Sequence, residues 1–214
     1  MTGNWDSIYK QHGSWLDDHH EDMPRVARFF KSRGVKRVLD LGCGAGRHVV
    51  YLGHRGFQVY GLDSSEEALK MARKALAETK VHAELNVGSM FEKLPYPDSF
   101  FDAIVCTKAL NHGTIESVRM AIREMERILE PGGMLFLVVT KSRKILRSEK
   151  QKREAEILAD RTLAPKTGRE IGVVHYQFNK EILLREFRHF KVLDFHVDSS
   201  RNYCLTGFLL GNEV

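Results

Sequence analysis

The chain has 214 residues, of which 43% are hydrophobic and 29% charged, a composition typical of a globular protein with a substantial core. No apolar run approaches the roughly 20 residues that span a bilayer, which excludes a membrane-spanning protein. The formal net charge of +5 is mildly basic, so the position of the excess charge matters more than its size.

Two further patterns indicate the compartment. The first residues, MTGNWDSIYKQHG, lack the apolar core of a signal peptide. The three cysteines, Cys43, Cys106 and Cys204, are far apart and set in hydrophobic runs, which favours buried free thiols over disulfides or a metal site. We therefore expect a cytoplasmic protein.

Hydrophobic runs alternate with helical patterns along residues 35–140. This alternation predicts an α/β fold with a doubly wound, mostly parallel sheet. One helix begins with Ser65 as a capping residue, followed by Glu66 and Glu67, whose charges suit the helix dipole. The predicted strands are 35–41, 57–62, 81–87, 100–106 and 134–139, and the predicted helices are 47–55, 65–78 and 115–129.

The pattern changes after Thr140. The two last strands are separated by only SSRN, which indicates an antiparallel hairpin at the edge of the sheet. Residues 4–33 are expected to be helical and to lie outside the core. The predicted elements after Thr140 are a charged helix at 141–164, an irregular stretch at 165–172, a short helix at 179–189, and strands at 192–198 and 203–210.

The stretch VLDLGCGAG places Gly42, Gly44 and Gly46 directly after the first strand. Glycine permits backbone torsions that a Cβ forbids, and the first N–H groups of the following helix point into the same space. The spacing is not the G-x-G-x-x-G of a dinucleotide site, which disfavours a nicotinamide-dependent enzyme, and the Lys-Ser/Thr of a triphosphate loop is absent. Taken alone, the glycines fit either a structural turn or a ligand-binding loop.

The second predicted strand ends at Asp63. A carboxylate at that strand tip can accept both hydroxyls of a ribose, and it repels a 2′-phosphate. Strand, glycine loop, helix, strand and acid together predict a ligand that contains an unmodified ribose and is not a dinucleotide.

Four stretches, VLDLGCGAG, VYGLDSS, LPYPDSFFDAIVC and REMERILEPGGMLFLVV, resemble in order and spacing the successive motifs of the class I S-adenosylmethionine-dependent methyltransferases. The resemblance covers about residues 35–140 and is greatest to the small-molecule-type branch. It implies that family's Rossmann-like sheet of seven strands, with an antiparallel C-terminal hairpin, and S-adenosyl-L-methionine as the cofactor.

The resemblance also implies roles for individual residues. Asp40 holds the methionine amino group, directly or through water, and Asp63 takes the ribose hydroxyls. The chain departs from many relatives at Ser89, where they carry an Asp, so the adenine amino group meets a hydroxyl without the strength of a charged acceptor. The implied cofactor-binding residues are Asp40, Gly42, Gly44, Asp63, Ser64, Ser89, Met90, Cys106 and Thr107.

Methyl transfer from a sulfonium needs alignment and a dry pocket, and it needs a base only where the nucleophile must first lose a proton. Asn111 and His112 follow the fourth strand, close to where the methyl group is expected, and are the catalytic candidates. His112 is interpreted either as a general base with a pKa near neutrality or as a capping or packing residue. His175 and Tyr176 in GVVHYQF either contact the acceptor or pack under the charged segment.

Three other features are less specific. Adjacent histidines in DDHHED, residues 17–22, point in different directions and no second ligand cluster answers them, so we expect a solvated polar face and no metal site. The basic segment 141–153 predicts a solvated helix or lid, with an anionic small acceptor or RNA as alternatives, although no RNA-binding module accompanies it. Trp5, Tyr9 and Trp15 either close over the cofactor or anchor their segment.

We therefore expect a single-domain enzyme that transfers a methyl group in line to a nucleophilic atom of a small-molecule acceptor, an anionic one being an option. Residues 1–34 close over the site, 35–214 form the methyltransferase domain, and 141–178 supply a substrate lid or insertion. The alternatives are an RNA (tRNA) base methyltransferase and a non-catalytic S-adenosylmethionine-binding module. The acceptor atom, the need for a base and the oligomeric state are left open by the sequence.

Overall fold

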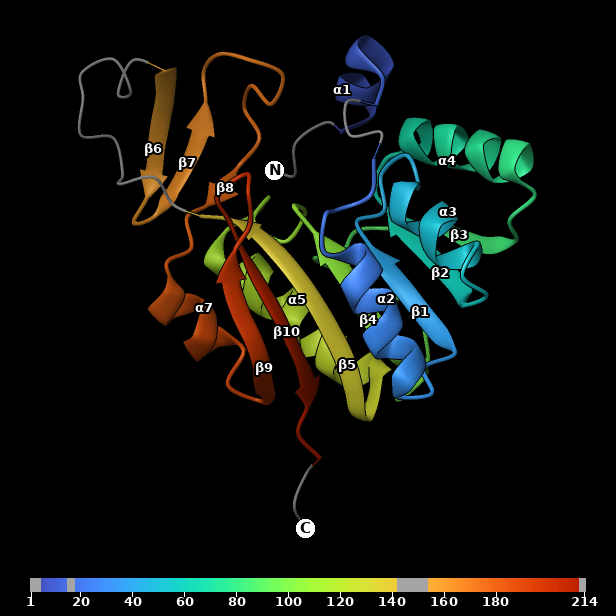
Figure 1. Cartoon of the computed structure of the whole chain (residues 1–214). Coiled ribbons are helices and arrows are strands. Elements are labelled where there is room, and N and C mark those ends of the chain that lie inside the picture. The colour runs from blue at the N-terminus through green and yellow to red at the C-terminus, as the bar shows by residue number, and fades with distance from the viewer. Residues whose placement is uncertain (1–4, 15–17, 142–153, 212–214) are drawn as a thin grey trace.

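The computed structural model describes residues 5–14, 18–141 and 154–211. Its centre is a seven-stranded sheet in the order β3-β2-β1-β4-β5-β10-β9, and a three-stranded sheet in the order β6-β7-β8 lies to one side (Figure 1). The strands are β1 (Arg37–Leu41), β2 (Gln58–Asp63), β3 (Ala83–Val87), β4 (Phe101–Thr107), β5 (Leu129–Thr140), β6 (Ala155–Ala159), β7 (Thr162–Pro165), β8 (His175–Tyr176), β9 (Phe190–Val197) and β10 (Asn202–Leu209). The helices are α1 (Trp5–His12), α2 (Met23–Ser32), α3 (Arg47–Gly53), α4 (Glu66–Thr79), α5 (Ile115–Ile128) and α7 (Lys180–Glu186).

The large sheet is parallel except at one edge. β1 pairs in parallel with β2 on one side and with β4 on the other, so that Asp40 stands opposite both Gly61 and Val105. β2 and β3 are parallel, as are β4 and β5, whereas β10 runs antiparallel to both β5 and β9. These pairings confirm the predicted α/β fold, with its mostly parallel seven-stranded sheet and antiparallel C-terminal hairpin.

Helices cover both faces of this sheet (Figure 1). Successive residues of β1 point to opposite faces: Val38 belongs to a core cluster that includes residues of α2, α3 and α4, and Leu39 belongs to another that includes residues of α5 and α7. Strands buried on both faces are nearly continuous hydrophobic runs, which explains why the sequence pattern revealed them. In the described part of the chain, every helix is too short or too polar to cross a membrane.

The N-terminal segment differs from the expectation that residues 4–33 lie outside the core. α2 buries Met23, Val26, Ala27 and Phe30 in the hydrophobic cluster on one face of the sheet. The ring of Phe30 meets the ring of Phe57 edge-on, with 6.4 Å between the centroids. The error arose because the position of α2 is decided by long-range packing, which a local pattern does not show.

Two polar residues of the same segment are also placed differently from the expectation of a solvated face. His20 is only 7% exposed, and its Nε2 lies 3.0 Å from Oδ2 of Asp198. Nε2 of His196 lies 2.9 Å from Oδ2 of Asp22. These contacts tie the segment before α2 to the β9–β10 hairpin, whose side chains are distant in sequence and therefore invisible to local analysis.

The helix predicted at 141–164 is wrong within the described residues. β6 and β7 form an antiparallel pair there, and β7 also pairs antiparallel with β8. The turn between β6 and β7 contains Arg161 with a φ of 57°, and the backbone N–H of Gln177 donates to the carbonyl of Arg161 at 2.7 Å. Strand pairing and this turn override the helix propensity of the Ala- and Glu-containing sequence. Residues 142–153 of the basic segment lie outside the described residues.

Replacing Phe30 by Ala should lower the free energy of unfolding by about 3–5 kcal/mol, because a fully buried ring is removed from the core and a cavity remains. The matched control is Arg28→Ala on the exposed side of the same helix, where a change within about 0.5 kcal/mol is expected. Urea unfolding of both variants measures the difference. Equal, small effects would show that α2 is not part of the core.

Candidate functional site

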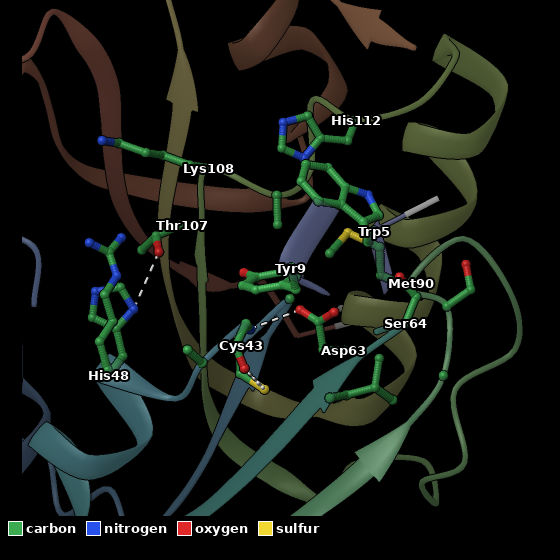
Figure 2. Close-up of a pocket in the computed structure, with 18 of the residues that line it drawn as sticks. Trp5, Tyr9, Cys43, His48, Asp63, Ser64, Met90, Thr107, Lys108 and His112 are labelled. Carbon is green, nitrogen blue, oxygen red and sulfur yellow. Dashed lines mark hydrogen bonds between the residues drawn. The ribbon is translucent and has the colours of Figure 1, made fainter. Parts of the chain in front are cut away.

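A cavity of about 340 Å³ opens at the carboxyl ends of β1, β2 and β4. Its wall combines the glycine loop after β1, the ends of β2 and β4, the turn after β3, helix α1, and the loop before β8. Figure 2 shows Asp63 and Tyr9 near the middle of this cavity, with His112 and Trp5 together on one side and His48 on another. One pocket therefore gathers residues from most of the chain.

The glycine loop needs its glycines. Gly42 and Gly44 have φ values of 77° and 53°, in the left-handed region that side chains disfavour. A Cβ on Gly42 would also collide with the side chain of Ala109 and approach Cε of Met90 to 2.8 Å. The loop thus presents bare backbone to the cavity, which is the property that a closely bound ligand requires.

Asp63 closes the opposite wall at the tip of β2. Its Oδ2 accepts from the backbone N–H of Gly44 at 2.8 Å, and its Oδ1 accepts from that of Ser65 at 2.9 Å. Burial raises the pKa of Asp63 above its ordinary value, while these N–H groups act in the opposite direction. The carboxylate is held in a fixed position with both oxygens facing the glycine loop and the start of α4.

Asp40 lies behind the loop and does not line the cavity. It is fully buried, and neither carboxylate oxygen has a hydrogen-bond partner within the described residues. Burial raises its pKa to about 7. Nδ1 of His48 is 3.8 Å from Oδ2 of Asp40, and burial lowers the pKa of His48 well below its ordinary value. A buried acid without a partner is a site prepared for a cationic or hydrogen-donating group.

His48 connects this acid to the end of β4. Its Nε2 accepts from the backbone N–H of His20 at 3.1 Å, so in the neutral ring the proton is on Nδ1. That Nδ1 lies 3.3 Å from Oγ1 of Thr107, to which it donates. The ring therefore fixes the side chain of Thr107, which lines the cavity. Sequence analysis missed His48, because its only signal is a place on the inward face of α3.

The remaining predicted cofactor residues divide into two groups. Ser64, Ser89 and Met90 line the cavity, and Oγ of Ser89 accepts from the backbone N–H of Phe91 at 3.2 Å. Cys106 is not part of the wall, since its side chain is fully buried in the core cluster beneath β4. The structure thus brings all the predicted cofactor residues except Asp40 and Cys106 to the cavity surface.

Helix α1 crosses the cavity. A Cβ on Gly44 would collide with the hydroxyl of Tyr9, so this ring lies directly over the glycine loop (Figure 2). Asp6 anchors the helix, because its Oδ1 accepts from Oγ of Ser65 at 2.7 Å and from the backbone N–H of Glu67 at 3.1 Å. The first of these bonds is the main cause of the lowered pKa of Asp6. Trp15, the other aromatic candidate of this segment, lies outside the described residues.

The candidates beyond β4 occupy the side of the cavity near β8. His112 and His175 line the wall, and their rings meet edge-on with 4.9 Å between the centroids. Burial lowers the pKa of His112 to about 4, in contrast to the near-neutral pKa that a general base requires. Asn111 and Tyr176 lie just behind the wall, where the backbone N–H of Tyr176 donates to the carbonyl of Asn111 at 2.8 Å.

Sequence analysis also missed Glu170, which lines the cavity beside the two histidines. Its Oε2 lies 3.1 Å from Nε2 of His175. Glu170 belongs to the loop between β7 and β8, and neither a motif nor a periodicity marks it. Arg47 and Lys108 were missed as well, although their neighbours in the glycine loop and at the tip of β4 signal the cavity.

The buried carboxyl of Asp40 predicts a pH-dependent stability. Between its ordinary pKa of 3.8 and the folded value of about 7, the unfolded chain loses this proton while the folded chain keeps it. The free energy of unfolding of the unmodified protein, relative to that of Asp40→Asn, should therefore fall as the pH rises from 4 to 7. The fall is at most about 1.4 kcal/mol per pH unit. Urea unfolding at several pH values measures this difference, with exposed Asp160→Asn as the control. A difference independent of pH would contradict the expectation.

Comparison with known proteins agrees with this geometry. Residues 38–133 match the family model described as a methyltransferase domain. The chain is similar to YcgJ of Bacillus subtilis, an uncharacterized methyltransferase, with 32% identity over 118 residues, 55% of this chain and 46% of that protein. It is also similar to the ubiquinone biosynthesis O-methyltransferase of Xanthomonas oryzae, with 36% identity over 101 residues, 47% of this chain and 41% of that protein. The matched region thus spans somewhat less than half the length of these relatives.

A solved structure has the same fold over nearly the whole chain. The 1,6-didemethyltoxoflavin-N1-methyltransferase of Burkholderia thailandensis, with 1,6-didemethyltoxoflavin and S-adenosylhomocysteine bound, has a TM-score of 0.74 at 17% identity, covering 97% of this chain and 86% of that one. Motifs, family model, relatives and fold agree with one another. Residues 38–133 are thus similar to a methyltransferase domain, and the described chain has the fold of a methyltransferase.

Proposed function

We propose that this protein transfers a methyl group from S-adenosyl-L-methionine to a nucleophilic atom of a small-molecule acceptor. The observation that carries the proposal is a single cavity whose wall includes both the glycine loop with Asp63 and the pair His112 and His175. A cofactor bound along the loop and an acceptor beside the histidines share one enclosed space. In-line transfer requires that arrangement.

The residues present fit the cofactor. The unpartnered, buried carboxyl of Asp40 is prepared for the methionine amino group, either directly or through a water molecule. Asp63 accepts hydrogen bonds from the ribose hydroxyls. The backbone of Gly42 and Gly44 leaves space for the part of the cofactor between the amino group and the ribose. The adenine lies against the cavity residues Ser64, Ser89 and Met90, and the main chain of Thr107, which lines the wall, serves the methionine end together with that of the adjacent Cys106 behind it.

The bound cofactor supplies an activated methyl group on a sulfonium, and the protein supplies alignment and exclusion of water. Tyr9 and Trp5 of α1 cover the cavity, in keeping with a closing role for residues 1–34. Asn111 and His112 act at the acceptor end, His112 as a neutral ring that orients the acceptor. His175 and Tyr176 belong to the part of 141–178 that forms the acceptor pocket.

A small molecule is the preferred acceptor class for two reasons. The relatives include an enzyme named for O-methylation in ubiquinone biosynthesis, and the structural neighbour holds a small heterocycle named in its description. The histidine side of the cavity is enclosed by α1 and by the loop before β8.

The three cysteines are free and buried, which supports a reducing compartment such as the cytoplasm.

The test is a turnover assay that measures S-adenosylhomocysteine formation with fractionated cell metabolites and, in parallel, with bulk tRNA. Turnover with a metabolite fraction alone is expected. Turnover with tRNA alone would replace the proposal by RNA methylation, which the basic segment at 141–153 would then serve. Cofactor binding without turnover on either class would leave a non-catalytic binding module.

Asp63→Asn should lower the affinity for S-adenosyl-L-methionine about 10- to 100-fold, because the ribose hydroxyls lose a charged acceptor worth about 1.5–3 kcal/mol. Isothermal titration calorimetry measures the affinity, and circular dichroism checks that the variant is folded. Asp98→Asn, at a carboxylate that is 77% exposed, is the matched control and should bind as the unmodified protein does. Unchanged affinity in Asp63→Asn would refute the assigned cofactor position.

A further inference from the structure

The acceptor side of the cavity carries a group of side chains that the transfer of a methyl group does not by itself explain. His112, Glu170 and His175 all line the wall, and they come from three segments: the loop after β4, the loop between β7 and β8, and β8. Each offers one nitrogen or oxygen ligand atom, and these atoms all lie within 4.8 Å of one another. Two imidazoles and one carboxylate form a common ligand set for a transition metal.

The spacing of the closest two atoms suits a shared ion. Nε2 of His175 lies 3.1 Å from Oε2 of Glu170, yet within the described residues it makes no aligned hydrogen bond. Ligand atoms about 2.1 Å from one ion and 3.1 Å apart subtend about 95°, between octahedral and tetrahedral angles. Two ligands of one ion lie at most about 4.2 Å apart. The ligand atoms of all three residues lie within 4.8 Å of one another, so an ion that holds the whole set draws the His112 ligand atom to within this limit.

Burial and charge favour the same occupant. The side chain of Glu170 is 32% exposed and that of His175 is 12% exposed. Buried charges in proteins are usually paired or coordinate metals, so a largely buried carboxyl group between imidazole rings favours a cation.

Asn111 provides support behind the ligands. Its Nδ2 lies 3.5 Å from Nδ1 of His175, and its buried Oδ1 has no partner within the described residues. Turning this amide places Oδ1 beside Nδ1, where it accepts the ring proton and leaves the lone pair of Nε2 directed at the cavity. Ligating histidines are usually held by such a second contact, which also raises their basicity.

We propose that His112, Glu170 and His175 bind one divalent transition-metal ion of the zinc type, with open coordination positions facing the acceptor. Magnesium and calcium are poorer occupants, because they prefer oxygen ligands to imidazole. Ion binding stands on these three residues alone, whereas the ion's role rests on the proposed function.

In that role the ion holds an oxygen or nitrogen of the acceptor, which makes a chelating hydroxyl compound the favoured substrate class. Coordination lowers the pKa of the hydroxyl, and its proton leaves to the solvent. The oxygen lone pair then forms the bond to the methyl carbon. The electron pair of the broken carbon–sulfur bond remains on sulfur.

The experiment is a titration of tag-free, EDTA-treated and dialysed protein with Zn²⁺ by calorimetry, and with Co²⁺ by visible absorption. One ion per chain is expected at micromolar concentrations. Glu170→Gln and His175→Ala should each weaken binding at least about tenfold, and Asn111→Ala should weaken it about 10- to 100-fold. Thermal unfolding of each variant checks the fold, and Glu170→Gln, the most conservative change, decides the result where another variant is unfolded.

Two controls use other histidines of the chain. His189→Gln alters an exposed pair in which Nδ1 lies 3.0 Å from Oε1 of Glu126. His196→Gln alters a second group of metal-ligating type, Asp22, His196 and Cys204, which lies outside the cavity wall. Both variants should bind the ion as the unmodified protein does.

Absence of binding by the unmodified protein, full binding by Glu170→Gln, or loss of binding in His196→Gln would overturn the proposal. A separate titration with S-adenosyl-L-methionine keeps the two conclusions apart. Ion binding without cofactor binding contradicts the proposed function and leaves the metal site standing. Cofactor binding without ion binding contradicts the metal site and leaves the proposed function standing.

Discussion

β1 lies between β2 and β4, and the chain reaches these two neighbours in opposite directions along the sheet. The helices that follow β1 and β4 therefore leave on opposite faces, and a crevice opens beyond the carboxyl end of β1. Asp40 stands at this point, opposite Gly61 on one side and Val105 on the other. The topology thus places one buried acid, the glycine loop and Asp63 around the same opening. The other lining segments, α1 and the loops after β3, after β4 and before β8, surround this opening.

The glycine-loop side of the cavity was predictable from sequence because its signals are local. A strand, three glycines and the beginning of a helix all fall within about twelve residues. The carboxylate of Asp63, at the end of the next strand, follows at a spacing that the fold sets. The capping role expected for Ser65 is confirmed, since its Oγ accepts from the backbone N–H of Ala68 at 3.1 Å. The side chain of Cys106 lies in the core, and the backbone role that the resemblance implies for this residue stays a prediction.

The side of the cavity near β8 was only half predictable, for a physical reason. His112 and His175 are 63 residues apart, and they meet where the backbone N–H of Tyr176 donates to the carbonyl of Asn111, not because of any shared pattern. Glu170 reaches them from an irregular loop, and α2 is held in the core by packing and by polar contacts to the distant β9–β10 hairpin. Contacts of this kind depend on the whole fold, so a local interpretation assigned the two histidines separately and missed the carboxylate between them.

The two sides of the cavity are joined through Ser65. Its backbone N–H donates to Asp63, which faces the cavity, while its hydroxyl donates to Asp6, which anchors α1. A group that binds Asp63 therefore acts on the same residue that holds α1, and α1 carries Trp5, whose ring lies 4.7 Å from that of His112. Asp63 on one side of the cavity is therefore linked, through the backbone and the hydroxyl of one residue at the start of α4, to the helix that places Trp5 beside His112 on the other side.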